Sequence, residues 1–129
     1  MRLLLDTHIW LWSLQSPHRL GRRVQRELED PLNEIWLSPI SIWEALMLYS
    51  KQRVVLPPSI SSWVSRATAP FREASLSHEI ALLSREMQIP HQDAADRFLV
   101  ATAKVLDLTL VTADRTLLGL SEINTLANL

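Results

Sequence analysis

Short apolar runs alternate with longer amphipathic segments along the whole chain. Leu3–Leu5 is an unbroken apolar run that stops at Asp6, which is typical of a strand covered on both faces. Further strands are predicted at Glu34–Ser38, Phe71–Leu76, Asp107–Thr112 and Ile123–Leu126. Helical segments separate these strands, and the alternation predicts an α/β fold with a central, mainly parallel sheet flanked by helices.

The helices are predicted from apolar residues at helical spacing and from the residues that start and stop them. Ser38 is a candidate N-cap with Pro39 in the first turn, and Asp93 is a candidate N-cap of the clearest helix. Pro31 and Pro90 mark two helix ends. The predicted helices are Thr7–Leu14, Leu20–Leu32, Ser38 to about Lys51, Ser59 or Ser61 to Ala67, Ser77–Met87 and Asp93–Leu106.

The length and composition indicate a single domain without cysteine chemistry or a membrane span. The chain has 129 residues, a length that fits one domain spanning residues 1–129. It has no cysteine, which excludes a disulfide framework, a thiol nucleophile and a thiolate metal site. No apolar run approaches the ~18 residues of a membrane span, and Asp6 and His8 interrupt the N-terminal apolar run, unlike a signal peptide. We therefore expect a soluble, cytoplasmic protein with no membrane partner.

The overall charge balance gives little support to a nucleic-acid partner, because the formal net charge is −1. The distribution of the acids changes this picture. Setting aside the five acids considered below leaves 9 acids (14 less 5) against 13 Lys and Arg, a remainder of +4. An acidic site within a mildly basic surface suits a metal ion that faces a polyanion.

Four acids are predicted to meet at one edge of the sheet. Asp6 and Asp114 each follow a predicted strand, and Glu44 and Asp96 lie in the early turns of helices that begin at the same edge. Two carboxylates ~5 Å apart repel by roughly 3 kcal/mol at an effective dielectric of ~20. A divalent cation removes this repulsion and can activate a water for attack on phosphorus. Oxygen ligands without cysteine or a histidine pair favour Mg²⁺ or Mn²⁺ over Zn²⁺.

Each acid also has a purely structural interpretation. Glu44 follows Ser41 at the spacing of a capping box. Asp93 is a natural N-cap, Asp96 is a first-turn acid that the helix dipole favours, and Asp114 can cap the turn after its strand. The case for a metal site therefore rests on the agreement of the four contexts, and whether Asp93 joins the site or only caps its helix stays open.

Three segments carry a resemblance to a known family. LLLDTHIWLW, SPISIWEALML, and HQDAADRFLVATA followed by LTLVTAD resemble a PIN domain of the VapC-type toxin ribonucleases found in bacterial toxin–antitoxin pairs. The resemblance covers nearly the whole chain and implies a three-layer PIN-like fold. It also implies a Mg²⁺- or Mn²⁺-dependent endoribonuclease that cleaves RNA phosphodiester bonds with a metal-activated water. The family's four acids correspond to Asp6, Glu44, Asp96 and Asp114; Asp93 matches an additional acid, which Ala94 follows where a proline is usual.

The resemblance implies roles for residues beside these acids. Thr7 and Thr112 would orient ligands or waters. Arg97 and Arg115 adjoin the acids, where each would contact phosphate or form a salt bridge to a neighbouring carboxylate. The implied partners are an RNA substrate, a second copy of the chain in a homodimer, and a cognate antitoxin that covers the acidic groove and inhibits the enzyme.

Two histidines and two tryptophans near the acids have structural or interface interpretations. His8 and His91 are interpreted as structural, because metal-activated water needs no histidine base. Trp10 and Trp12 cannot both face inward, since residues two apart on a helix point to different sides. One of the two is therefore expected at a dimer or partner surface.

Two other function classes remain as alternatives. A phospho-accepting receiver-like signalling domain also places acids at strand ends, but it needs an early acid pair and a lysine after a late strand, and the sequence has neither in that arrangement. A non-catalytic nucleic-acid-binding PIN module would keep the fold and bind metal without turnover. The presence of all four acids argues against the second alternative.

Overall fold

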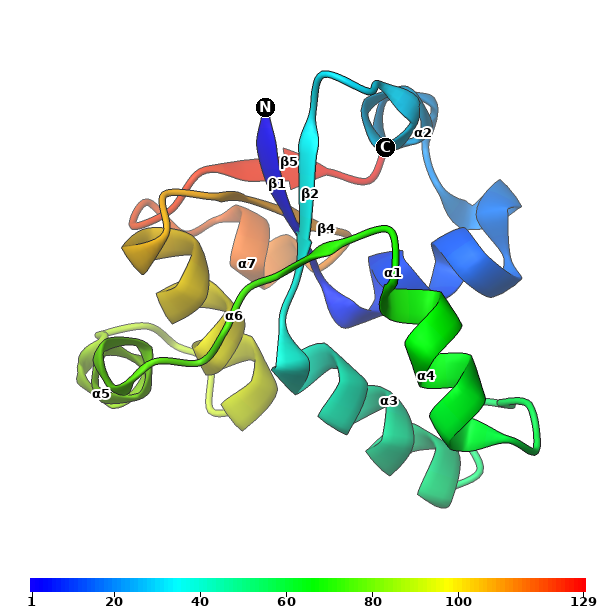
Figure 1. Cartoon of the computed structure of the whole chain (residues 1–129). Coiled ribbons are helices and arrows are strands. Elements are labelled where there is room, and N and C mark those ends of the chain that lie inside the picture. The colour runs from blue at the N-terminus through cyan, green and yellow to red at the C-terminus, as the bar shows by residue number, and fades with distance from the viewer.

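A computed structural model describes residues 1–129 and contains one five-stranded parallel sheet (Figure 1). The strand order is β3-β2-β1-β4-β5, so the first strand lies at the centre. The strands are β1 (Arg2–Leu5), β2 (Glu34–Leu37), β3 (Arg72–Glu73), β4 (Thr109–Thr112) and β5 (Thr125–Ala127). All the predicted strands are present, and the sheet is parallel throughout, which confirms the predicted α/β class.

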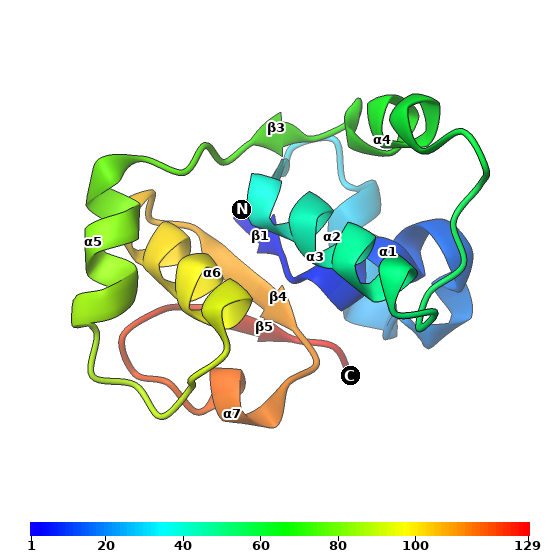
Figure 2. The same ribbon diagram turned by 90° about the horizontal axis from the view of Figure 1, so that it is seen from below.

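Seven α-helices and one 3₁₀ helix (Pro17–Arg19) cover the sheet. In Figure 2 the helices α1 to α4 lie to one side of the strands, and α5 and α6 lie to the other. This arrangement has the three layers that we expected. The helices are α1 (Thr7–Gln15), α2 (Arg22–Glu29), α3 (Pro39–Ser50), α4 (Ile60–Thr68), α5 (His78–Glu86), α6 (Ala94–Val105) and α7 (Arg115–Leu118).

The central strand explains the unbroken apolar run at the start of the chain. Leu3, Leu4 and Leu5 are each 0% exposed, because helices cover both faces of β1. Leu3 and Leu5 join the core beneath α1, α2 and α4, whereas Leu4 joins the core beneath α5 and α6. Each buried leucine contributes about 1.5–3 kcal/mol to folding, so this strand anchors both layers.

Two predicted elements are several residues shorter in the structure. The strand predicted over Phe71–Leu76 contains only Arg72 and Glu73, which pair with β2 at the edge of the sheet. The helix predicted over Leu20–Leu32 spans only Arg22–Glu29, because Gly21 is held as its N-cap by a 2.7 Å hydrogen bond from its N–H to Asn128 Oδ1. Neither difference changes the strand order.

The strand order excludes the receiver-like alternative. Receiver domains have the flavodoxin-like order 2-1-3-4-5, in which the third strand follows the first across the sheet. Here β3 is an outer strand beside β2, and β1 pairs with β4 instead. None of the helices combines the length and the apolar character that a membrane span requires.

Candidate active site

A cleft of about 760 Å³ opens at the carboxyl ends of the central strands. The four predicted acids meet there, although they come from four separate parts of the chain. Asp93 lines the same cleft as these four acids. The acids in the cleft are Asp6, Glu44, Asp93, Asp96 and Asp114.

Asp6 is the most buried of these acids, with 8% of the residue exposed. It caps α1 because its Oδ1 accepts a 2.7 Å hydrogen bond from the backbone N–H of Thr7. Its Oδ2 accepts a 2.6 Å hydrogen bond from the hydroxyl of Thr112 at the end of β4. Burial raises the pKa of Asp6 above its usual value, and these hydrogen bonds oppose the shift.

Asp114 is joined to Asp6 through the same threonine. The hydroxyl oxygen of Thr112 accepts a 3.1 Å hydrogen bond from the backbone N–H of Asp114. The Oδ1 of Asp114 accepts from the N–H groups of Thr116 and Leu117, so this acid does cap the turn after its strand. Its Oδ2 takes no part in the cap and lies 3.7 Å from Nε2 of His91. Capping and facing the cleft are therefore compatible.

The capping-box interpretation of Glu44 is wrong, because α3 begins three residues earlier than that interpretation requires. Its N-cap is Ser38, whose hydroxyl oxygen accepts a 3.0 Å hydrogen bond from the N–H of Ile40. Ser41 lies inside the helix and is buried, and its hydroxyl accepts a 3.0 Å hydrogen bond from Thr7. The Glu44 side chain is thus free to line the cleft.

The environment of Glu44 raises the pKa of its carboxyl group. Burial raises the pKa of Glu44, and the negative charges of Asp6 and Asp93 raise it further. The neighbouring Thr7 side chain opposes the shift. Thr7 therefore connects α1 to α3 at the point where Asp6 approaches Glu44.

The start of α6 places two more acids in the cleft. Asp93 is its N-cap and accepts a 3.0 Å hydrogen bond from the N–H of Asp96, as the sequence predicted. Burial, followed by the negative charges of Asp6, Asp93, Glu44 and Asp114, raises the pKa of Asp96 to about 7. Asp93 is thus a helix cap that also adds negative charge to the cleft.

His91, which the sequence led us to interpret as structural, lies beside two of these acids. Its side chain is 10% exposed, and its Nε2 lies 3.7 Å from both Asp96 Oδ2 and Asp114 Oδ2. Its Nδ1 is buried and has no hydrogen-bond partner. In the sequence His91 stands two residues before the N-cap Asp93, and this closeness to an acid was the available signal.

The structure corrects the expectation for Arg97, whose side chain neither faces the cleft nor pairs with a carboxylate. It is 8% exposed and points toward the end of α5 and the segment that follows. Its guanidinium donates to the backbone carbonyls of Ser84, Met87, Ile89 and His91. Arg97 therefore holds the segment before α6 in place. Arg115 is exposed at the start of α7 and makes no side-chain ion pair, and it does not line the cleft.

The residues of the cleft fit a hard divalent cation. Burial and mutual repulsion raise the pKa of three carboxyl groups, so a positive charge is favoured at this place. His91, Asp96 and Asp114 each offer a donor atom, and these atoms lie within 4.8 Å of one another. Carboxylate oxygens with at most one imidazole are a donor set for Mg²⁺ or Mn²⁺, whereas zinc sites use more nitrogen or sulfur.

Comparisons with known proteins agree with this fold. Ribonuclease VapC22 from Mycobacterium tuberculosis (strain ATCC 25618 / H37Rv) is 29% identical over 118 residues, which are 89% of this chain and 88% of that protein. The structure resembles that of VapBC2 from Rickettsia felis bound to a promoter DNA fragment, with a TM-score of 0.73, 17% identity and 98% of each chain covered. It also resembles a toxin–antitoxin complex from Klebsiella pneumoniae, with a TM-score of 0.62, 20% identity and 98% of each chain covered.

The sequence profile of the PIN domain matches residues 3–122, which contain β1 from its second residue, β2 to β4, every helix and all five acids of the cleft. The five parallel strands and the helical layers on both faces agree with that match. The chain belongs to the PIN domain family.

Proposed function

We propose that this protein is a Mg²⁺- or Mn²⁺-dependent endoribonuclease of the VapC toxin type. The observation that carries the proposal is the convergence of Asp6, Glu44, Asp96 and Asp114 in one cleft at the carboxyl edge of the sheet. A similar protein bears the name ribonuclease, which supports RNA as the substrate.

The acids have two kinds of part in the proposed mechanism. Asp6 is held rigidly by the hydroxyl of Thr112 and the N–H of Thr7, so its carboxylate keeps one orientation while substrate binds. Glu44, Asp96 and Asp114 line the same cleft, where their carboxylates would hold the cation and take up the proton of an attacking water. A bound divalent cation would supply positive charge that neutralises the acids and stabilises the developing negative charge of phosphodiester hydrolysis.

His91 has a positioning role in this proposal. Its Nε2 lies 3.7 Å from Asp96 Oδ2 and from Asp114 Oδ2, and so stands between the two carboxylates. Arg97 supports His91 indirectly, through the 2.7 Å hydrogen bond to the carbonyl of His91. In this proposal His91 and Arg97 position the acids, and the acids act on the RNA.

The proposed partners follow from the same comparisons. Similar structures include toxin–antitoxin complexes, which supports a cognate antitoxin that inhibits this protein by covering the cleft. We propose a homodimer as the working unit, with residues 1–129 of each copy acting as one domain. The exposed Trp43, at 53%, and Tyr49, at 40%, give α3 an apolar surface compatible with such contacts.

Cleavage of RNA by the purified protein tests the proposal. The wild-type chain, Asp6→Asn and Asp107→Asn are incubated with RNA in Mg²⁺, in Mn²⁺ and in a chelator. We expect cleavage by the wild type and by Asp107→Asn, an exposed acid outside the cleft, and none by Asp6→Asn or in the chelator. Equal activity of Asp6→Asn and wild type would reject the assignment. Metal binding without turnover on any RNA would favour the non-catalytic module.

A further inference from the structure

The cleft continues beyond the acids along one face of α1. The helix residues that line it recur three and four positions apart, as expected for one helix face. They are His8, Leu11, Trp12 and Gln15. At the far end the lining changes in character, because Arg19 and the loop residues Arg53–Val55 close it. One cleft thus has an acidic end and a basic, aromatic end.

Trp12 forms the aromatic part of this far end. The guanidinium carbon of Arg19 lies 4.3 Å from the centre of the Trp12 ring, and the ring of His8 lies 5.9 Å away at an angle of 52°. Trp10 is by contrast fully buried, and its Nε1 donates a 3.1 Å hydrogen bond to the carbonyl of Ala67. The prediction that the two tryptophans face different sides is therefore confirmed, and Trp12 is the one at the surface of the cleft.

The loop that carries Arg53 is held against α1. The side-chain amide of Gln15 donates a 2.9 Å hydrogen bond to the carbonyl of Val55. The loop is entered through a turn at Gln52, whose φ is 59°. Arg53 therefore stands at a defined place on the cleft wall rather than at the tip of a free loop.

Neither arginine at this end is neutralised by a carboxylate. The ion pairs of the structure involve Arg2, Arg72 and His91, and none includes Arg19 or Arg53. Five acids line the same cleft, but their carboxylates form no ion pair with Arg19 or Arg53. The two arginines remain available instead for a negatively charged ligand.

We infer that the end of the cleft formed by Trp12, Arg19 and Arg53 is a subsite for a single-stranded RNA nucleotide adjacent to the bond that is cut. The inference rests on the proposed function. The Arg19 guanidinium lies over the Trp12 ring, and a nucleobase can stack on such a pair of planar groups, while unpaired arginines attract backbone phosphates. α1 spans about 10 Å from His8 to Gln15, which separates this subsite from the acids along the cleft.

The charges at the two ends of the cleft favour RNA binding at the basic end and cleavage at the acidic end. Phosphates are repelled by the acidic end unless a cation is bound there, whereas Arg19 and Arg53 attract them at all times. The basic end therefore holds the RNA strand while the acids act on a neighbouring phosphodiester. A base on Trp12 can stack without pairing, so the subsite selects single-stranded RNA over a duplex.

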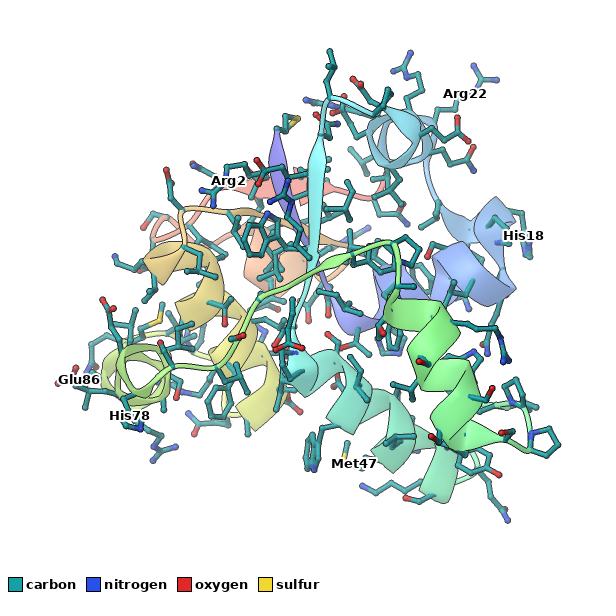
Figure 3. All side chains as sticks on the ribbon, in the orientation of Figure 1. Arg2, His18, Arg22, Met47, His78 and Glu86 are labelled. Carbon is teal, nitrogen blue, oxygen red and sulfur yellow. The ribbon has the colours of Figure 1, made fainter.

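Binding of short RNA to variants tests the subsite. Affinity is measured by fluorescence anisotropy with a labelled single-stranded oligoribonucleotide, in Ca²⁺, and cleavage is followed separately on gels. Arg53→Gln and Arg19→Gln are expected to weaken binding and to lower the slope of log Kd against log salt by about 0.7 each. Arg22→Gln is the matched control, because Figure 3 shows Arg22 pointing outward from α2 and it does not line the cleft. This control should leave both the affinity and the slope unchanged.

Stacking on Trp12 is tested with RNA that lacks one base at a time. Trp12→Ala is expected to weaken binding about tenfold, which corresponds to about 1.4 kcal/mol. The loss should vanish for the one oligonucleotide whose missing base is the base that stacks. Leu82→Ala, an exposed apolar residue on α5 outside the cleft, is the control and should show no such dependence. Trp12→Phe keeps an aromatic ring and serves if the alanine variant does not fold.

The outcomes separate this inference from the proposed function. Unchanged affinity and salt slope in Arg53→Gln, or a Trp12→Ala loss equal at every abasic position, would overturn the subsite while wild-type cleavage keeps the nuclease proposal. Loss of antitoxin binding with RNA binding unchanged would assign this end to the protein partner and likewise overturn it. Absence of both RNA binding and cleavage in the wild type would overturn both proposals.

Discussion

The hydroxyl of Thr112 donates a 2.6 Å hydrogen bond to Oδ2 of Asp6, across 106 positions of sequence. The contact exists because β1 and β4 are neighbours, with Leu5 paired to Val111 one residue before each side chain. The same hydroxyl accepts a hydrogen bond from the N–H of Asp114. A single side chain therefore sets the positions of two acids relative to each other.

Thr112→Val is expected to lower RNA cleavage by about 10- to 100-fold, because it keeps the volume but removes the hydroxyl that orients Asp6. The pKa of Asp6 should rise further, since this hydrogen bond opposes the effect of burial. The acidic limb of the pH–rate profile should then move to higher pH. Thr109→Val, at the opposite end of β4, is the control. An unchanged profile in Thr112→Val would show that the contact does not orient Asp6.

The raised pKa of Asp96 predicts how the metal-free protein responds to pH. Between its usual pKa of 3.8 and about 7, the folded state holds a proton on Asp96 that the unfolded state has lost. The folded state therefore binds more protons, and this group makes stability fall as pH rises through that window. Asp96→Asn should be more stable than wild type at pH 8 by about 1 to 2 kcal/mol, after allowance for solvent screening.

Urea unfolding in a chelator at several pH values measures this difference. Addition of Mn²⁺ should stabilise the wild type more at high pH than at low pH, because the ion binds the ionised acids. Asp96→Asn should lose most of that gain, whereas Asp107→Asn should behave as wild type. Identical pH dependence of wild type and Asp96→Asn would contradict the raised pKa.

Arg97→Leu should reduce the free energy of unfolding by about 3 kcal/mol, because it leaves buried carbonyls without donors. Arg97→Lys should recover little, since an ammonium cannot reproduce the planar set of donors. Arg85→Leu, an exposed arginine on α5, is the control and should change stability little. Full stability of Arg97→Leu in urea would show that the carbonyls find other partners.

Gly21→Ala tests how the C-terminal segment is anchored. A Cβ at this position would lie 1.6 Å from the backbone oxygen of Leu129, so residues 128 and 129 must move and the hydrogen bond from Gly21 to Asn128 is lost. We expect a loss of about 1–3 kcal/mol in thermal or urea unfolding. Gly119→Ala is the matched control, because its nearest atom outside the glycine's neighbours lies 3.6 Å away. Equal stability of both variants would contradict this packing.

The sequence predicted the parts of the fold that local pattern controls. The apolar run at Leu3–Leu5, the caps at Ser38 and Asp93, and the alternation of strands and helices are all local signals, and all are present. The convergence of the four acids followed from one general rule, that the carboxyl ends of parallel strands share an edge. These predictions needed no knowledge of which strands are neighbours.

Features that depend on long-range packing were not predictable in this way. The destination of Arg97 depends on how α5 and α6 pack, because its partners are carbonyls of residues 84 to 91. The place of His91 beside Asp96 and Asp114 depends on the path of that same segment. The basic end of the cleft joins α1 to a loop 40 residues away through Gln15 and Val55, a contact without a local signal.

The most direct test of the central claim is single-turnover cleavage of RNA by wild type, Glu44→Gln and Glu73→Gln across a titration of Mn²⁺. Glu44 lines the cleft, whereas Glu73 is an exposed acid on β3 outside it. The account predicts that Glu44→Gln is slower by about 100-fold or more, equivalent to at least ~2.7 kcal/mol, at saturating Mn²⁺, while Glu73→Gln matches wild type. Equal rates for Glu44→Gln and wild type, or cleavage that persists in a chelator, would contradict a metal-dependent site built from these acids.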